Sequence, residues 1–142
     1  PPPGSVQLEG RAEGRTNSKI NGVYIPVPGG FEGLPAYEKR EAGSRRLFLF
    51  YATPRKRWKV SDKLGDHKGG FAFVKTADGA APPVDLPDAV RWSVWDGKET
   101  GYKEDEHIRL RLLADAASGV LGTSQVSGAT SASSSSSGSE GE

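Results

Sequence analysis

Short apolar or alternating runs, separated by glycine and proline, dominate the middle of the chain. Runs of this length that are rich in β-branched and aromatic residues are typical of β-strands, and we find no ten-residue stretch with the period of an amphipathic helix. The pattern therefore predicts an all-β fold, a small antiparallel barrel or sandwich of about seven strands. The segments expected to form strands are 23–25, 36–39, 46–51, 57–60, 70–75, 90–95, 98–102 and 107–112.

Three of these segments carry more specific information. Residues 46–51 are apolar at every position after the first, which predicts a central strand covered on both faces. Asp96-Gly97 predicts a two-residue hairpin turn between 90–95 and 98–102, because glycine supplies the positive φ that such a turn needs. Residues 107–112 alternate well enough to form an edge strand, although residues 104–117 are also rich in helix formers and a helix there stays open.

The alternation also predicts which side chains face inward. In the segment 57–60, Trp58 and Val60 are expected to point into the core, so that Arg57 and Lys59 point together into solvent. The same reasoning gives the expected core as Tyr24, Tyr37, Leu47, Leu49, Trp58, Val60, Phe71, Phe73, Trp92, Val94 and Ile108.

Composition changes sharply along the 142 residues. All twelve aromatic residues lie between Tyr24 and Tyr102, whereas residues 114–142 contain ten serines and only three large apolar side chains. Such a tail cannot bury enough surface to offset chain entropy. We therefore expect a disordered linker at 1–18, a β domain at 19–113 and a disordered tail at 114–142. A domain between two linkers is expected to be one module of a longer protein.

The residue types argue against several function classes. Cysteine is absent and only two histidines occur, which excludes thiolate zinc sites, cysteine nucleophiles and multi-histidine metal sites. The sequence contains no Gly-x-Ser-x-Gly elbow, phosphate loop or dinucleotide fingerprint. We therefore predict no catalytic residues, no cofactor and no metal. No apolar run approaches the ~20 residues of a membrane span, and the lack of cysteine leans toward an intracellular location.

Charge is distributed unevenly, although the net charge is only +1. Residues 39–59 hold eight basic residues and one acid. If part of this run faces solvent on a hairpin, it forms an anion-attracting surface that fits an acidic protein partner. The alternative is a charged edge that only prevents aggregation. The basic residues assigned to partner binding are Arg45, Arg46, Arg55, Lys56, Arg57 and Lys59.

One aromatic residue joins this partner-binding set. Trp92 and Trp95 are three positions apart and fall on opposite faces of one strand, so at least one of them is expected to be only partly buried. We assign Trp95 to partner binding, because exposed rings near a turn can anchor a protein or stack on a sugar. The first hypothesis is therefore a non-catalytic scaffold or interaction module, and carbohydrate recognition stays open.

Residues 68–75 support a second hypothesis. They resemble the ribonucleoprotein octamer of RNA-recognition and cold-shock domains, with Gly70 inserted and Thr76 at the position of the last aromatic. That resemblance implies single-stranded nucleic-acid binding by a cold-shock-like barrel, with bases stacked on rings beside basic residues. A pair of core phenylalanines explains the same segment without any ligand. The residues assigned to nucleic-acid binding are Lys68, Phe71, Phe73 and Lys75.

The landmarks taken together suggest a family of modules. Segments 21–24, 31–37, 57–62 and 92–97 contain Asn-Gly-Val-Tyr, Phe-Glu-Gly-Leu-Pro-Ala-Tyr, Arg-Trp-Lys-Val-Ser-Asp and Trp-Ser-Val-Trp-Asp-Gly. In their order and spacing they resemble Gly/Trp-rich β modules that are repeated in multidomain proteins of protists. The resemblance covers residues 20 to about 112. It implies a non-catalytic binding or scaffold unit, and it transfers no site residue.

Overall fold

The computed structural model describes residues 1–40, 46–66 and 68–113. Within them, residues Ser5–Leu112 form one compact unit. The predicted tail at 114–142 lies outside the described residues. Two short 3-10 helices, η1 (Ser18–Ile20) and η2 (Thr53–Arg55), accompany the strands. The strands are β1 (Val6–Glu9), β2 (Gly22–Pro26), β3 (Tyr37–Arg40), β4 (Arg46–Ala52), β5 (Arg57–Ser61), β6 (Ala72–Lys75), β7 (Trp92–Trp95), β8 (Tyr102–Asp105) and β9 (Arg109–Leu112).

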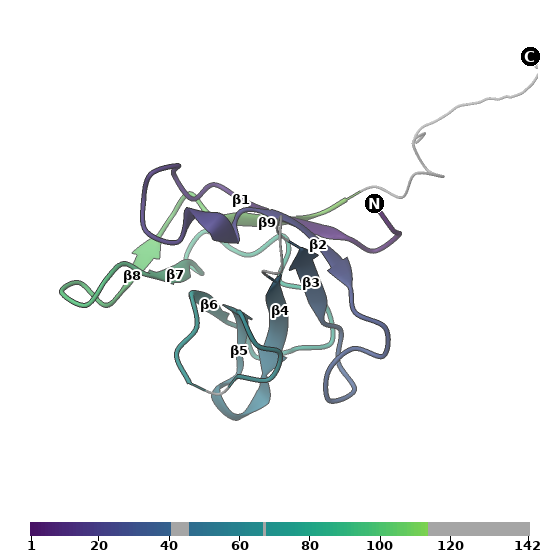
Figure 1. Ribbon diagram of the computed structural model, residues 1–142. Helices are drawn as coiled ribbons and strands as arrows, with labels where there is room; N and C mark the ends of the chain where they lie inside the picture. The colour runs from purple at the N-terminus through teal and green to yellow at the C-terminus, as the bar shows by residue number, and fades with distance from the viewer. Residues whose placement is uncertain (41–45, 67, 114–142) are drawn as a thin grey trace, which may run out of the picture. The chain divides into compact units, whose positions relative to one another are not determined.

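All nine strands belong to one antiparallel sheet in the order β8-β7-β6-β5-β4-β3-β2-β1-β9 (Figure 1). From β2 to β8 each strand pairs with the next one along the chain. The predicted all-β class is confirmed, with nine strands rather than about seven. Strand β4 lies in the middle of the order, as the apolar run at 46–51 predicts. The sheet is single and curled like a half-barrel, so the structure is closer to the predicted barrel than to a sandwich.

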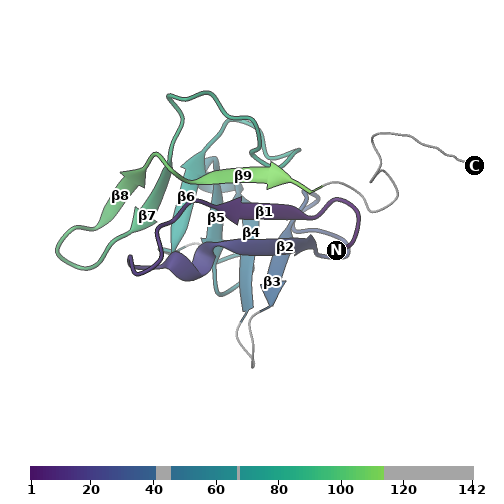
Figure 2. The ribbon, with the colours of Figure 1, turned by 90° about the horizontal axis from the view of Figure 1, so that it is seen from above.

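The curl of the sheet follows from one short connection. Strands β8 and β9 stand at opposite ends of the strand order, yet only residues 106–108 join them. The four Cα–Cα steps from Asp105 to Arg109 span at most about 14 Å, so the two ends of the sheet must approach one another at this corner. Figure 2 shows β9 lying across the sheet beside β1, close to the end of β8.

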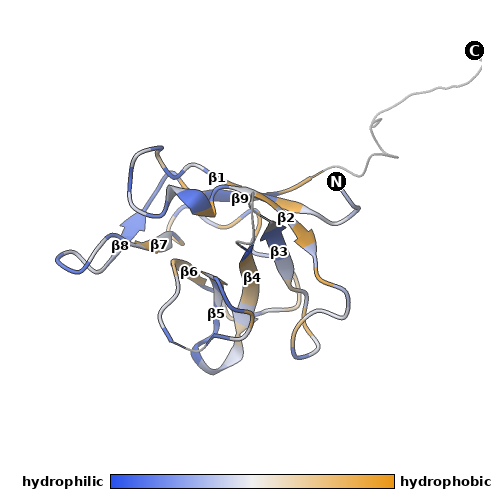
Figure 3. Cartoon of the chain, in the orientation of Figure 1, coloured by the Kyte–Doolittle hydropathy of each residue, from blue (hydrophilic) through white to orange (hydrophobic). Residues whose placement is uncertain are grey.

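The concave side of the curled sheet holds the main core, which includes Trp58, Trp92 and Tyr24. Of the residues predicted for the core, all but Phe71 and Phe73 are buried, and Phe71 is partly buried and packs against the main core. The outer side of β4 carries a second cluster of Ala36, Phe50 and Ala52, which confirms that β4 is covered on both faces. Figure 3 shows that β4 is mainly hydrophobic, whereas β8 is hydrophilic.

Strand β1 corrects the predicted linker at 1–18. Val6 and Leu8 are fully buried, and β1 pairs with β2 on one side and with β9 on the other. The strand has the alternation of a half-buried β-strand, but it is only four residues long and lies between proline- and glycine-rich segments. The folded unit therefore begins before residue 19, the predicted boundary.

The hairpin after β7 differs from the predicted two-residue turn. Trp95 pairs with Tyr102, so the connection comprises six residues, 96–101, and β8 begins at Tyr102 rather than at Lys98. The loop closes through a hydrogen bond from the Gly101 N–H to the Gly97 carbonyl, and both glycines have positive φ. The prediction identified the positive φ at Gly97 and missed the second one. At the C-terminal end, β9 confirms the strand over 109–112, and it lies at an edge.

Strand β6 has the opposite phase from the predicted one. Ala72 pairs with Val60 and Val74 pairs with Trp58, and these four side chains are all buried on the inner side. Phe73 therefore points to the outer side of the sheet. The reason is steric, because the inner side already holds Trp58 and Trp92 and leaves room for small residues from β6.

Candidate functional site

The outer side of strands β5 to β8 gathers most of the predicted functional side chains. Pairing brings Lys59 of β5 beside Phe73 of β6, and Trp95 of β7 beside Tyr102 of β8. Phe71, just before β6, joins them because its N–H donates to the Val60 carbonyl and its own carbonyl accepts from the Trp95 N–H. We call this surface the Tyr102 face. Its residues are Arg55, Arg57, Lys59, Phe71, Phe73, Trp95 and Tyr102.

Three rings of the Tyr102 face form a continuous cluster. The Tyr102 ring centroid lies 5.1 Å from that of Phe73 and 5.1 Å from that of Trp95, edge to face in both pairs. The Tyr102 hydroxyl donates to the Gly70 carbonyl at 2.7 Å and so fixes the ring. Tyr102 remains 37% exposed. The cluster thus holds an exposed ring in one orientation. Because the side chain is already ordered, ligand binding costs less conformational entropy.

Both phenylalanines carry a cation over the ring. The Arg57 guanidinium carbon lies 4.2 Å from the Phe73 centroid, and the Lys19 ammonium lies 3.9 Å from the Phe71 centroid. These are cation–π distances. One face of each ring is therefore already occupied by a side chain of the protein, which leaves less ring surface for the base stacking predicted at Phe71 and Phe73.

The prediction that Lys59 points into solvent is wrong, because only 4% of the residue is exposed. Its ammonium group donates to the Asp66 carbonyl at 2.5 Å and to the Lys68 carbonyl at 3.3 Å. Gly70 permits this position, since a Cβ there would lie 2.7 Å from the Lys59 Cε. Burial lowers the pKa of Lys59, Asp66 raises it, and the neighbouring Arg57 and Arg55 lower it further.

The Asp66 carboxylate is held by the same loop. Its Oδ1 accepts from the Lys68 N–H at 2.9 Å, and its Oδ2 accepts from the Ser61 hydroxyl at 2.9 Å. The Lys68 hydrogen bond is the main reason why the pKa of Asp66 is lowered. Lys59 and Asp66 therefore fix the loop between β5 and β6 against the Tyr102 face.

Two hollows adjoin Tyr102, and both are lined by Tyr102 and Gly69. We call the smaller one, about 90 Å³, the cationic hollow. We call the larger and more open one, about 350 Å³, the aromatic hollow. The cationic hollow is lined by Ala52, Pro54, Arg55, Arg57, Lys59, Gly69 and Tyr102. The aromatic hollow is lined by Ser61, Asp62, Asp66, Gly69, Gly70, Phe71, Trp95 and Tyr102.

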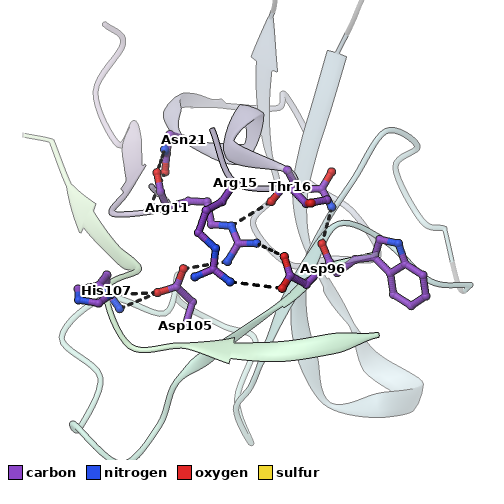
Figure 4. Close-up of polar contacts among 9 residues, drawn as sticks. Arg11, Arg15, Thr16, Asn21, Asp96, Asp105 and His107 are labelled. Atoms are coloured by element: carbon purple, nitrogen blue, oxygen red, sulfur yellow. Dashed lines mark hydrogen bonds and ion pairs between the residues drawn. The ribbon is translucent and has the colours of Figure 1, made fainter. Parts of the chain in front are cut away.

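A separate charged cluster closes the corner where β8 meets the rest of the sheet (Figure 4). Arg11 is buried and donates to Asp105 at 2.9 Å and to Asp96 at 3.1 Å. Its Nε donates to the Thr16 carbonyl, and Asn21 bonds to both its N–H and its carbonyl. Every charge of this group, which we call the Arg11 cluster, is compensated within the protein, and this indicates a structural role.

The Arg11 cluster adjoins the Tyr102 face through the backbone. Asn17 donates from its side-chain amide to the Trp95 carbonyl at 2.9 Å. The Asp96 carboxylate that follows Trp95 in the chain binds Arg11 and Arg15. Trp95 is therefore held in place from the segment between β1 and β2. No sequence pattern indicated this, because the partners are about eighty positions apart.

The remaining predicted basic residues are not all brought together. Arg46 pairs with Glu38 at 3.2 Å and lies six positions along β4 from Ala52, the partner of Arg57. At 3.2–3.4 Å per residue this is about 20 Å, so Arg46 does not join Arg57 as predicted. Arg45 falls outside the described residues. Lys56 and Lys75 are exposed at the ends of β5 and β6.

Lys68 is also exposed, and it contributes its backbone groups to the loop rather than its charge. Sequence reasoning did not assign Tyr102 or Lys19 to the site. Tyr102 was missed because the predicted two-residue turn would pair Trp95 with Lys98, whereas the six-residue loop pairs it with Tyr102. Lys19 reaches Phe71 through tertiary structure alone.

A third hollow, of about 310 Å³, lies between β9 and residues 83–90. Its lining includes Asp85 and Asp88, and its two arginines already have partners within the chain, since Arg111 binds Glu9 at 3.2 Å and Arg109 donates to the Glu106 carbonyl. We therefore place the candidate site at the Tyr102 face.

Across residues 1–40, 46–66 and 68–113, no three histidine, aspartate or glutamate side chains are grouped so as to hold a metal ion. Over the same residues, no helix has the length and apolar character needed to cross a membrane. Comparison of the chain with family models, with curated proteins and with solved structures gave no match.

Proposed function

We propose that residues Ser5–Leu112 form a non-catalytic interaction module that binds an acidic segment of a protein partner at the Tyr102 face. The observation that carries the proposal is the placement of an exposed, fixed ring between a cationic and an aromatic hollow. Such a surface can hold an apolar side chain and a neighbouring anionic one together. The resemblance to Gly/Trp-rich modules agrees with a non-catalytic binding or scaffold unit and specifies neither the partner nor the site.

Single-stranded nucleic acid fits this face less well. A nucleic-acid strand needs several free ring faces and a continuous basic groove. Here Arg57 and Lys19 cover one face of each phenylalanine, and Asp62 and Asp66 line the hollow on the far side of Tyr102. Those carboxylates would repel a second phosphate, so a protein ligand is the better interpretation.

Selection from a random peptide display library tests this function. We expect the wild-type chain to enrich peptides in which acidic residues adjoin an aromatic or aliphatic residue. The Trp95→Ala variant should lose that enrichment, and Arg46→Ala, which removes a distant cation, should retain it. Enrichment that is unchanged in Trp95→Ala would contradict the proposal. Binding of a labelled thymidine oligonucleotide at ~50 mM salt, lost steeply as salt rises, would favour nucleic acid instead.

A further inference from the structure

The cationic hollow concentrates positive charge that Asp66 offsets only in part, through its attraction to Lys59. Arg55, Arg57 and Lys59 all line it, and none of them forms an ion pair with a carboxylate among the described residues. The nearby carboxylate of Asp66 is already hydrogen-bonded to the Lys68 N–H and to Ser61. The three cations therefore repel one another across a small volume.

Free hydrogen-bond donors accompany this charge. The Nε of Arg57 is buried and has no hydrogen-bond partner among the described residues. An ammonium group has three donors, and two hydrogen bonds to carbonyls are found for Lys59. Buried donors without partners are costly. A ligand with several acceptor oxygens would offset the positive charge of these side chains.

The size of the hollow limits the ligand. At about 90 Å³ the cationic hollow is much smaller than the aromatic hollow of about 350 Å³, which favours a compact anionic group there. No carboxylate lines the cationic hollow, whereas the aromatic hollow next to it has Asp62 and Asp66. Anionic groups are thus favoured on one side of Tyr102 only.

We propose that the cationic hollow binds the phosphate monoester of a phosphorylated side chain in the partner, while the aromatic hollow receives a neighbouring residue. A phosphate carries a charge of about −1.5 to −2 and three acceptor oxygens, and so suits a hollow lined by three cations better than a single carboxylate does. A nucleic-acid strand would continue toward Asp62 and Asp66 and be repelled. This inference rests on the proposed function and specifies its partner chemistry.

Fluorescence anisotropy with two degenerate peptide pools tests the inference. One pool has a fixed central phosphoserine and the other has serine at that position. We expect the wild-type chain to bind the phosphoserine pool about tenfold more tightly. Inorganic phosphate should compete for the phosphoserine pool. Arg55→Ala, which changes an exposed side chain, should remove most of the preference, and Arg46→Ala, a matched loss of one positive charge, should keep it.

Equal affinity for the two pools would overturn the inference, and so would a preference that falls equally in Arg55→Ala and Arg46→Ala. Tighter binding of a thymidine oligonucleotide than of the phosphoserine pool would overturn it in favour of nucleic acid. Failure of the proposed function gives a different result. In that case inorganic phosphate still binds the wild-type chain and does not bind Arg55→Ala. The affinity for either peptide pool is then the same in Trp95→Ala as in the wild type.

Discussion

Two cation clusters of the same folded unit differ in how their charge is neutralised. Arg11 is buried and forms ion pairs with both Asp96 and Asp105. Arg55, Arg57 and Lys59 lie together on the Tyr102 face without an ion pair to any described carboxylate. The first arrangement stabilises the fold by joining β8 to the segment after β1. In the second arrangement Lys59 fixes the loop after β5, whereas the exposed charge of Arg55 is available to a ligand.

Removal of Arg11 should have the largest effect on stability. In Arg11→Met, the buried Asp105 carboxylate loses its cation, and breaking a buried ion pair in this way typically costs about 3–5 kcal/mol. Chemical denaturation of the variant and the wild type measures this difference directly. A loss below about 1 kcal/mol would show that the Arg11 cluster does not hold the corner between β8 and β9.

Trp95→Ala should have a smaller but measurable effect. The ring is only partly buried and packs against Tyr102 at 5.1 Å, so we expect a loss of about 1–2 kcal/mol, below the 3–5 kcal/mol of a fully buried tryptophan. Chemical denaturation of the variant, followed by the fluorescence of its remaining tryptophans, measures this loss. A loss as large as that of Arg11→Met would mean that Trp95 is a core residue, and a binding defect in this variant would then reflect unfolding.

Acid should weaken the fold through two carboxylates. Burial alone would raise the pKa of Asp105, but hydrogen bonds from the His107 N–H and from Arg11 outweigh burial and lower it. The pKa of Asp66 is also lowered. A carboxyl whose folded pKa is below its unfolded value, about 3.9, adds stability above that value. This stability should be lost as pH falls through the folded pKa values.

Thermal unfolding between neutral and strongly acidic pH measures this effect. The matched control is Asp105→Asn, which should be less stable than wild type at neutral pH and should lose less on acidification. If the acid dependence of Asp105→Asn equals that of the wild type, Asp105 does not contribute to it.

Arg55→Ala should have the smallest effect on stability. Exposed substitutions usually change the free energy of unfolding by less than about 0.5 kcal/mol. Here a slight gain is expected, because the variant removes repulsion against Arg57 and Lys59, whose pKa values are lowered by burial and further by the charge of Arg55. Denaturation measured beside Arg11→Met sharpens the contrast between the two clusters. A clear loss in Arg55→Ala would mean that the cationic hollow is structural after all.

Local sequence patterns predicted the all-β class and the central strand. The errors of that prediction have physical causes. The apolar run at 46–51 correctly indicated the central, doubly covered β4. Strand β1 was missed because four residues carry little periodicity, and its burial depends on β2 and β9. The phase of β6 was wrong although Trp58 and Trp92 were correctly predicted for the core, because alternation alone does not show whether Phe73 or the smaller Ala72 and Val74 fit beside them.

The candidate site was predictable only in part. Alternation placed Arg57 and Lys59 on the outer face, but it did not show that loop carbonyls at 66 and 68 bury Lys59. The basic run suggested one continuous patch, whereas the register of β4 with β5 separates Arg46 from Arg57. Tyr102 depended on the length of the loop at 96–101, which two glycines and the contacts of Asp96 determine.

The central claim is that uncompensated cations beside Tyr102 form a ligand site. The most direct test is titration of the ¹⁵N-labelled chain with inorganic phosphate, followed by amide chemical shifts. The account predicts saturable shifts at Arg57, Gly69 and Tyr102, with none at Leu8 or Arg11, and loss of the shifts in Arg55→Ala. An absence of shifts, or small shifts spread evenly over all basic residues, would contradict it.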